Sequence, residues 1–206
     1  MGQEARCTVR IGEHVTEGKA LLETDELAFR GEDGYRLKMP FKSMSSVEAS
    51  DGELRVEWAD GRVAFELGTQ AERWAQKILN PPSLLDKLGV KAGMQVSVLA
   101  IDDPTFVDEL RQRTENVALD SGTPASDAIF VAINGPEDLD QFAALKRAIK
   151  PNGAVWAVFR KGRKDFNEND VLRGGLAVGL VDVKVVRFSA THTASKFVIR
   201  KAERGR

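Results

Sequence analysis

Residues 96–113 read VSVLAIDDPTFVDELRQR, and this stretch predicts how the second half of the chain folds. Its first six residues, Val96–Ile101, form an apolar run, which is typical of a central strand covered on both faces. Phe106, Val107 and Leu110 then fall on one face of a helix over Thr105–Arg113. A buried strand followed directly by an amphipathic helix predicts the first β-α unit of a parallel sheet.

Two further apolar runs, Ala128–Ile133 and Ala154–Phe159, extend this pattern. Between them, a helix is expected from Pro136 to about Lys150, with acidic residues in its first turn and basic residues in its last. Val181–Phe188 and Lys196–Lys201 follow one another without a helix and predict an antiparallel hairpin. The expected order β-α-β-β-α-β-α-β-β corresponds to a three-layer, Rossmann-like α/β domain over residues 81–206.

Residues 1–80 alternate instead with a period of two, as antiparallel strands do when one face is buried. Asp60-Gly61 separates two such runs and predicts a hairpin turn. Thr69 and Glu72 suggest a capping box before one amphipathic helix, which Pro81-Pro82 would end. About seven short strands followed by one helix resemble a pleckstrin-homology or GRAM-like barrel or sandwich. The chain is therefore expected to be an α+β protein of two domains, 1–80 and 81–206.

Composition sets broad limits on the partners and the compartment. The 206 residues carry a net charge of -1. Residues 1–80 contain 11 basic and 15 acidic residues, and residues 81–206 contain 19 basic and 16 acidic residues. This balance makes nucleic acid an unexpected partner, although the opposite charges of the halves could help them dock on each other. With one cysteine, Cys7, no internal disulfide can form. No signal sequence or membrane span is expected, which predicts a cytoplasmic protein.

Leu84–Ile101, Leu145–Phe159 and the terminal hairpin resemble the class I S-adenosylmethionine-dependent methyltransferase fold. This resemblance implies a cofactor site after the first strand, where that family carries a glycine-rich turn. The present chain instead continues with Asp102-Asp103-Pro104-Thr105-Phe106, without glycine. Asp120 stands where many members carry the acid that holds the cofactor ribose. The short connection after it indicates that one strand-helix unit of the family plan is absent.

Gly175–Lys201, GLAVGLVDVKVVRFSATHTASKFVIRK, resembles the C-terminal segment of the domain-of-unknown-function 3052 family. That resemblance implies a shortened methyltransferase-like fold and no particular reaction. Members often carry an aromatic residue and a glycine in the hairpin where this chain has Thr193-Ala194-Ser195.

Asp102, Asp103, Asp120 and Asn134 should end neighbouring strands at the carboxyl edge of the sheet, where open α/β sheets bind ligands. Such a group could bind a cation, an amine or a ribose. Alternatively, these residues are solvated loop side chains, with Asp103 capping the helix that follows.

A second candidate is the basic cluster formed by Arg160, Lys161, Arg163 and Lys164, which would bind an anion or nucleic acid, or would simply be a solvated loop. No catalytic or metal-binding set is expected, because His14 and His192 have no evident partner. The leading hypothesis is a non-catalytic binding or regulatory protein with a protein or small-molecule partner and no cofactor. The alternatives are an S-adenosylmethionine-dependent methyltransferase with an atypical loop, and an anion- or nucleic-acid-binding adaptor.

Overall fold

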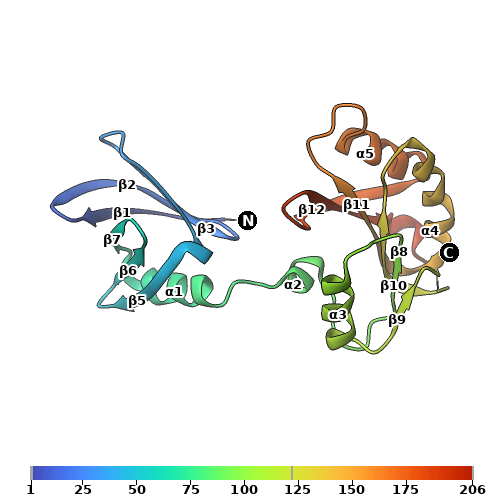
Figure 1. Ribbon diagram of the computed structural model, residues 1–206, viewed down its shortest axis with the longest axis horizontal. Helices are drawn as coiled ribbons and strands as arrows, with labels where there is room; N and C mark the ends of the chain where they lie inside the picture. The colour runs from blue at the N-terminus through green and yellow to red at the C-terminus, as the bar shows by residue number, and fades with distance from the viewer. Residues whose placement is uncertain (1, 122, 206) are drawn as a thin grey trace. The chain divides into compact units, whose positions relative to one another are not determined.

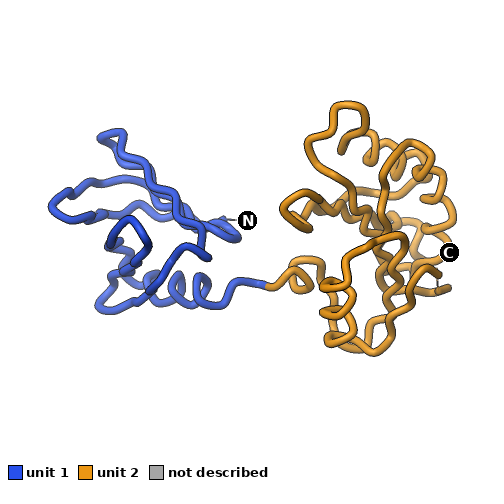
Figure 2. Tube along the Cα trace, in the orientation of Figure 1, with its two compact units in different colours: residues 1–82 blue, residues 83–206 orange. Residues whose placement is uncertain are grey.

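The computed structural model describes residues 2–121 and 123–205. The chain divides into two compact units, residues 1–82 (unit 1) and 83–206 (unit 2), as Figure 2 shows. The protein is of the α+β class, with a curled antiparallel sheet in unit 1 and a separate mixed sheet in unit 2 (Figure 1). None of the helices described has the length and apolar character that a membrane crossing needs.

Unit 1 is built on a sheet of seven strands in the order β4-β3-β2-β1-β7-β6-β5, each antiparallel to its neighbours. The predicted alternation explains its core, because every second residue points inward. The strands are β1 (Gln3–Ile11), β2 (His14–Leu22), β3 (Glu26–Gly31), β4 (Arg36–Pro40), β5 (Met44–Ser50), β6 (Glu53–Trp58) and β7 (Gly61–Glu66), with a short 3₁₀ turn η1 (Phe41–Ser43) before β5.

One helix, α1 (Ala71–Leu79), packs against β5 and β6 and places Trp74 in the core, where its side chain is fully buried. The predicted capping box of Thr69 and Glu72 is wrong. Thr69 lies in a 3₁₀ turn, η2 (Gly68–Gln70), and α1 begins without a side-chain cap. Gly68 takes a φ of +56°, so the chain enters the helix through this tight turn rather than through an extended cap residue.

Unit 2 has a six-stranded sheet in the order β12-β13-β11-β10-β8-β9 and is Rossmann-like. β8 to β11 pair in parallel, and β13 and β12 form the predicted antiparallel hairpin beside β11. The predicted order of strands and helices is confirmed. The elements are α2 (Leu84–Leu88), β8 (Val96–Leu99), α3 (Pro104–Arg113), β9 (Val117–Leu119), β10 (Ser126–Ala132), η3 (Pro136–Gln141), α4 (Phe142–Ala148), β11 (Ile149–Arg160), α5 (Glu168–Ala177), β12 (Leu180–Arg187), β13 (His192–Ile199) and η4 (Lys201–Glu203).

Two apolar clusters cover the two faces of this sheet. Phe130 and Trp156 face α2 and α3, whereas Ile129 and Val155 face α4 and α5. The runs that are apolar on both faces thus become central strands, as expected.

The helix predicted from Pro136 to about Lys150 is shorter and divided. Its first six residues form the 3₁₀ segment η3, α4 follows, and β11 already begins at Ile149. The Asp138 carboxylate accepts hydrogen bonds from the backbone N–H groups of Asn134 and Gly135, at 2.7 and 3.3 Å. This local turn competes with a regular α-helical start.

Replacing Gly175 in α5 by alanine tests the packing of unit 2. A Cβ at this position would lie 2.4 Å from the ring of Phe197 in β13, so we expect G175A to lower the free energy of unfolding by about 1–3 kcal/mol. In the control G174A, the new Cβ meets the flexible end of Leu139 at 2.8 Å, so the loss should be much smaller. Urea unfolding of both variants gives the comparison, and equal stability of G175A and wild type would contradict it.

The pH dependence of unit 1 should reflect Cys7, which is buried in β1. Burial raises the pKa of the Cys7 thiol from about 9 to about 11. Between these values the folded chain holds the thiol proton more tightly than the unfolded chain. The contribution of Cys7 to stability is therefore present below pH 9 and is lost as the pH rises toward 11. The free energy of unfolding should fall more steeply across this window in wild type than in C7A, and identical slopes would contradict the assignment.

Candidate functional site

The strand order of unit 2 reverses at β8. From β8 the chain passes through α3 to β9 on one side, whereas β10 pairs on the other side of β8 and leads through α4 to β11. The connections that leave the carboxyl ends of β8 and β10 therefore run in opposite directions. In open α/β sheets this switch point leaves a crevice, which is the usual place for a ligand.

A cavity of about 330 Å³ lies at this switch point, and we call it the switch-point cavity. Its walls come from the ends of β8, β10 and β11 and from the connection between β12 and β13. The lining residues are Ala100, Ile101, Asp102, Asp103, Ala132, Asn134, Val158, Phe188, Ser189 and His192.

Three of the four predicted cleft residues lie together in this cavity. Asp102 and Asp103 follow β8, and Asn134 follows β10. Asp120 is placed directly after β9 at the neighbouring strand end, where it is exposed, and it is not among the lining residues. Asp120 thus ends the strand next to β8, as expected, but it lies outside the cavity because β9 is on the far side of β8 from β10.

Asp103 both lines the cavity and caps a helix, the two roles between which the sequence did not decide. Its carboxylate accepts a hydrogen bond from the backbone N–H of Phe106 at 3.0 Å, and it is thereby the N-cap of α3. The same side chain lines the cavity, while the neighbouring Asp102 is exposed at the rim. The loop from Ala100 to Asp103 thus forms one wall of the cavity and does not fill it.

Ala100 allows the chain to turn after β8 without a glycine. Its φ is +54°, a left-handed conformation that strains any residue with a Cβ. Asp120, after β9, has a φ of +51°, so both neighbouring strand ends turn in the same strained way. Strain of this kind persists only where the surrounding structure enforces it.

Sequence reasoning set His192 aside, yet it lines the cavity. The antiparallel register pairs His192 with Arg160, which brings the hairpin turn to the carboxyl end of β11. The Oγ1 of Thr191 lies 3.0 Å from Nδ1 of His192, and Ser189 accepts hydrogen bonds from the backbone N–H groups of both residues. These contacts hold the imidazole through Nδ1. The length of the β12–β13 hairpin could have indicated this residue, because strands of that length bring the turn between them to the ligand-binding edge of the sheet.

The basic cluster is divided by the structure. The Arg163 guanidinium donates to the backbone carbonyl of Asn134 at 2.5 Å, lies 5.8 Å from the ring centroid of Phe166, and forms an ion pair with Asp165. Its proximity lowers the pKa of Asp165 to about 2. Arg163 therefore fastens its loop to the rim of the switch-point cavity, whereas Arg160, Lys161 and Lys164 are exposed.

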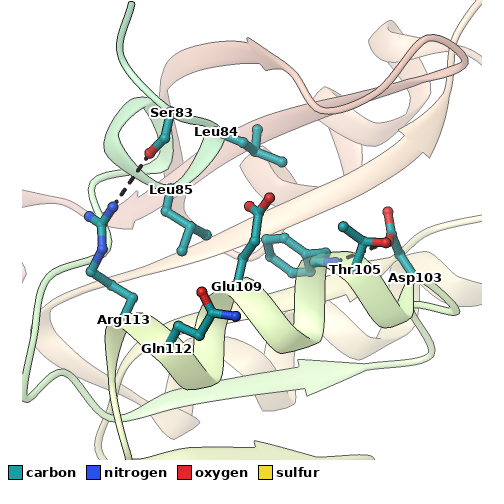
Figure 3. Close-up of a pocket in the computed structure, with 9 residues that line it drawn as sticks. Ser83, Leu84, Leu85, Asp103, Thr105, Glu109, Gln112 and Arg113 are labelled. Carbon is teal, nitrogen blue, oxygen red and sulfur yellow. Dashed lines mark hydrogen bonds between the residues drawn. The ribbon is translucent and has the colours of Figure 1, made fainter. Parts of the chain in front are cut away.

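A larger hollow of about 550 Å³ lies between α2 and α3 (Figure 3). Arg113 crosses this seam and donates to Asp86 at 2.8 Å and to the carbonyl of Val90 at 3.1 Å. The Arg113 guanidinium is the main reason why the pKa of Asp86 falls to about 2. These bonds tie the two helices together, so we interpret the hollow as a structural seam. Among the residues described, no His, Cys, Asp and Glu side chains gather as a metal site.

Relief of the strain at Ala100 is directly measurable. Because glycine adopts a positive φ without penalty, A100G should raise the free energy of unfolding by about 0.5–1 kcal/mol. The control A132G lies in the same cavity but at the end of the regular strand β10, where glycine should cost about 0.5–1 kcal/mol. Destabilisation by both substitutions would contradict the strained conformation.

No protein-family model matches the sequence, and no curated protein matches it. The chain is similar to several solved structures. A SAM-dependent methyltransferase from Aquifex aeolicus is 18% identical, and the match covers 57% of this chain and 88% of that chain at a TM-score of 0.47. A SAM-dependent O-methyltransferase from Thermotoga maritima is 10% identical, and the match covers 86% of this chain and 94% of that chain at a TM-score of 0.43. The N-terminal PH domain of the human ARAP2 protein is 15% identical over 39% of this chain and 77% of that chain, with a TM-score of 0.32.

Proposed function

We propose that this protein is a non-catalytic binding protein whose unit 2 holds a small ligand in the switch-point cavity. The observation that carries this proposal is the convergence of Asp102, Asp103 and His192 on one cavity at the edge where open α/β sheets bind ligands. They come from two separate parts of the chain, the end of β8 and the hairpin turn.

The lining defines the class of ligand. Two carboxylates and the side chain of Asn134 favour amino or hydroxyl groups, which donate hydrogen bonds, and the carboxylates favour a positive charge. Val158 and Phe188 supply an apolar wall. The volume of about 330 Å³ is at the lower end of the range for ligand pockets, so it suits a single small metabolite.

Within this proposal, unit 1 is a pleckstrin-homology or GRAM-like module, and unit 2 is a truncated class I methyltransferase-like domain of the domain-of-unknown-function 3052 type. The strand order and the terminal hairpin of unit 2 support that description. The edge position of β9 fits the absence of one strand-helix unit.

S-adenosylmethionine-dependent methyl transfer is the second candidate, because the loop after β8 leaves the cavity open. The placement of Asp120 outside the lining favours the first candidate, since this carboxylate would hold the ribose in the methyltransferase interpretation. Anion binding by Arg160, Lys161, Arg163 and Lys164 is supported less, because Arg163 is already engaged with Asp165 and Asn134.

Calorimetry on the full chain tests the proposal with three probes: putrescine, adenosine and S-adenosylmethionine. We expect a probe that carries amino or hydroxyl groups to bind, and D102N to weaken it by about 5- to 100-fold, because a charged hydrogen-bond acceptor is lost. The control D108N changes an exposed carboxylate of α3 that does not line the cavity, so it should have no effect.

The outcomes separate the candidates. Binding that is weakened in D102N and unchanged in D108N and D120N supports the proposed cavity. Binding of S-adenosylmethionine that is lost in D120N, together with methyl transfer to an acceptor, supports the methyltransferase. The proposal fails if none of the three probes binds.

A further inference from the structure

The outer face of unit 1 carries a row of four cations that runs straight across four strands. Arg6 of β1 pairs with Lys19 of β2, Lys19 with Arg30 of β3, and Arg30 with Arg36 of β4. We call these four residues the cation row. All four are exposed.

Strand alternation places the four side chains on the same face. The adjacent residues in three of the strands are buried in the core: Cys7 beside Arg6, Ala20 beside Lys19 and Phe29 beside Arg30. Side chains directly opposite each other in adjacent strands have Cβ atoms about 5 Å apart, so the row spans about 14 Å.

This arrangement is electrostatically unfavourable, because like charges directly opposite each other destabilise a sheet. Acidic neighbours reduce this repulsion between like charges at one end of the row only. Arg6 forms an ion pair with Glu32, and Lys19 forms one with Glu4 at 2.6 Å. Across residues 2–121 and 123–205, neither Arg30 nor Arg36 makes an ion pair. The end of the row over β3 and β4 is therefore uncompensated.

A hollow of about 280 Å³ adjoins the row. Arg6, Lys19 and Arg30 line it together with Glu32 and the cross-strand pair Gly18 and Gly31. Gly18 is buried, and a Cβ there would meet the ring of Phe29 on the core face, opposite to the row. A Cβ at Gly18 would lie 2.2 Å from the carbonyl oxygen of Arg30, so the backbones approach closely here. Three cations and the Glu32 carboxylate thus surround this space. Arg6 and Lys19 are already in ion pairs, which leaves Arg30 as the cation most open to a phosphate group that enters it.

We propose that the cation row binds a linear chain of phosphates, of the kind found in inorganic polyphosphate. Such a chain is flexible and carries closely spaced negative charges along one line, so it can follow a straight row of cations. Protection of the sheet edge would require charges only on β4, the edge strand, whereas the row continues inward to β1. A nucleic acid shares the phosphate chemistry, but no aromatic side chain stands in the row to stack its bases.

The test measures binding of a fluorescent medium-chain inorganic polyphosphate to the full chain at several salt concentrations. The variant R30Q/R36Q removes the two cations without ion pairs. We expect its affinity to fall at least roughly tenfold and its salt slope to fall by about 1.4, at about 0.7 for each lost phosphate contact. The control K42Q/R73Q removes the same charge from exposed positions of unit 1 outside the row.

Thermal unfolding without ligand adds a readout that is independent of binding. Because R30Q/R36Q removes like-charge repulsion, its melting temperature at low salt should equal or exceed that of wild type. Lower stability of the variant would overturn the description of the row as uncompensated.

Two comparison ligands identify the source of the phosphates. Oligothymidine of matched total charge and vesicles containing phosphatidylserine should both bind more weakly than polyphosphate. Tighter binding of either one in a row-dependent manner would overturn the assignment in favour of a nucleic acid or a membrane surface. Equal losses in the row and control variants, or no binding of polyphosphate to wild type, would overturn the site itself.

Discussion

Parallel pairing of β8 with β9 on one side and with β10 on the other determines the arrangement of unit 2. The pairing forces the connections after β8 and β10 to leave in opposite directions, and this separation opens the switch-point cavity. It also buries β8 and β10 on both faces, which requires the apolar runs seen in the sequence. The ligand-binding edge is therefore a consequence of the strand order rather than of any single side chain.

The terminal hairpin completes the cavity because of its register. β13 pairs antiparallel with β11, so its first residue, His192, lies beside the last residue of β11. The hydrogen bonds among Ser189, Thr191 and His192 hold this turn, and Arg163 fastens the opposite loop to Asn134. Both contacts fix loops at the rim, and a preformed rim lowers the entropic cost of binding a ligand.

The sequence predicted the strand and helix order of unit 2 because apolar runs and amphipathic periods report directly on burial. It also predicted that Asp102, Asp103 and Asn134 lie at one edge, since they follow strands in a parallel sheet. The spacing of hydrophobic residues along the chain does not reveal which strands lie next to each other in the sheet. For this reason the separation of Asp120 from the cavity and the arrival of His192 could not be predicted. The start of α1 and the division of the helix after Pro136 were missed because local turns around Gly68 and Asp138 compete with regular capping.

The entry of a ligand at the switch point of unit 2 links the strand order to the proposed function. Its most direct test is a titration of the isotopically labelled full chain with adenosine and with putrescine, followed by backbone amide NMR shifts. We expect changes in three separate segments, residues 100–103, Asn134 and residues 188–192, which come together around the cavity. Changes confined to the seam between α2 and α3, or to residues near Asp120, would contradict it.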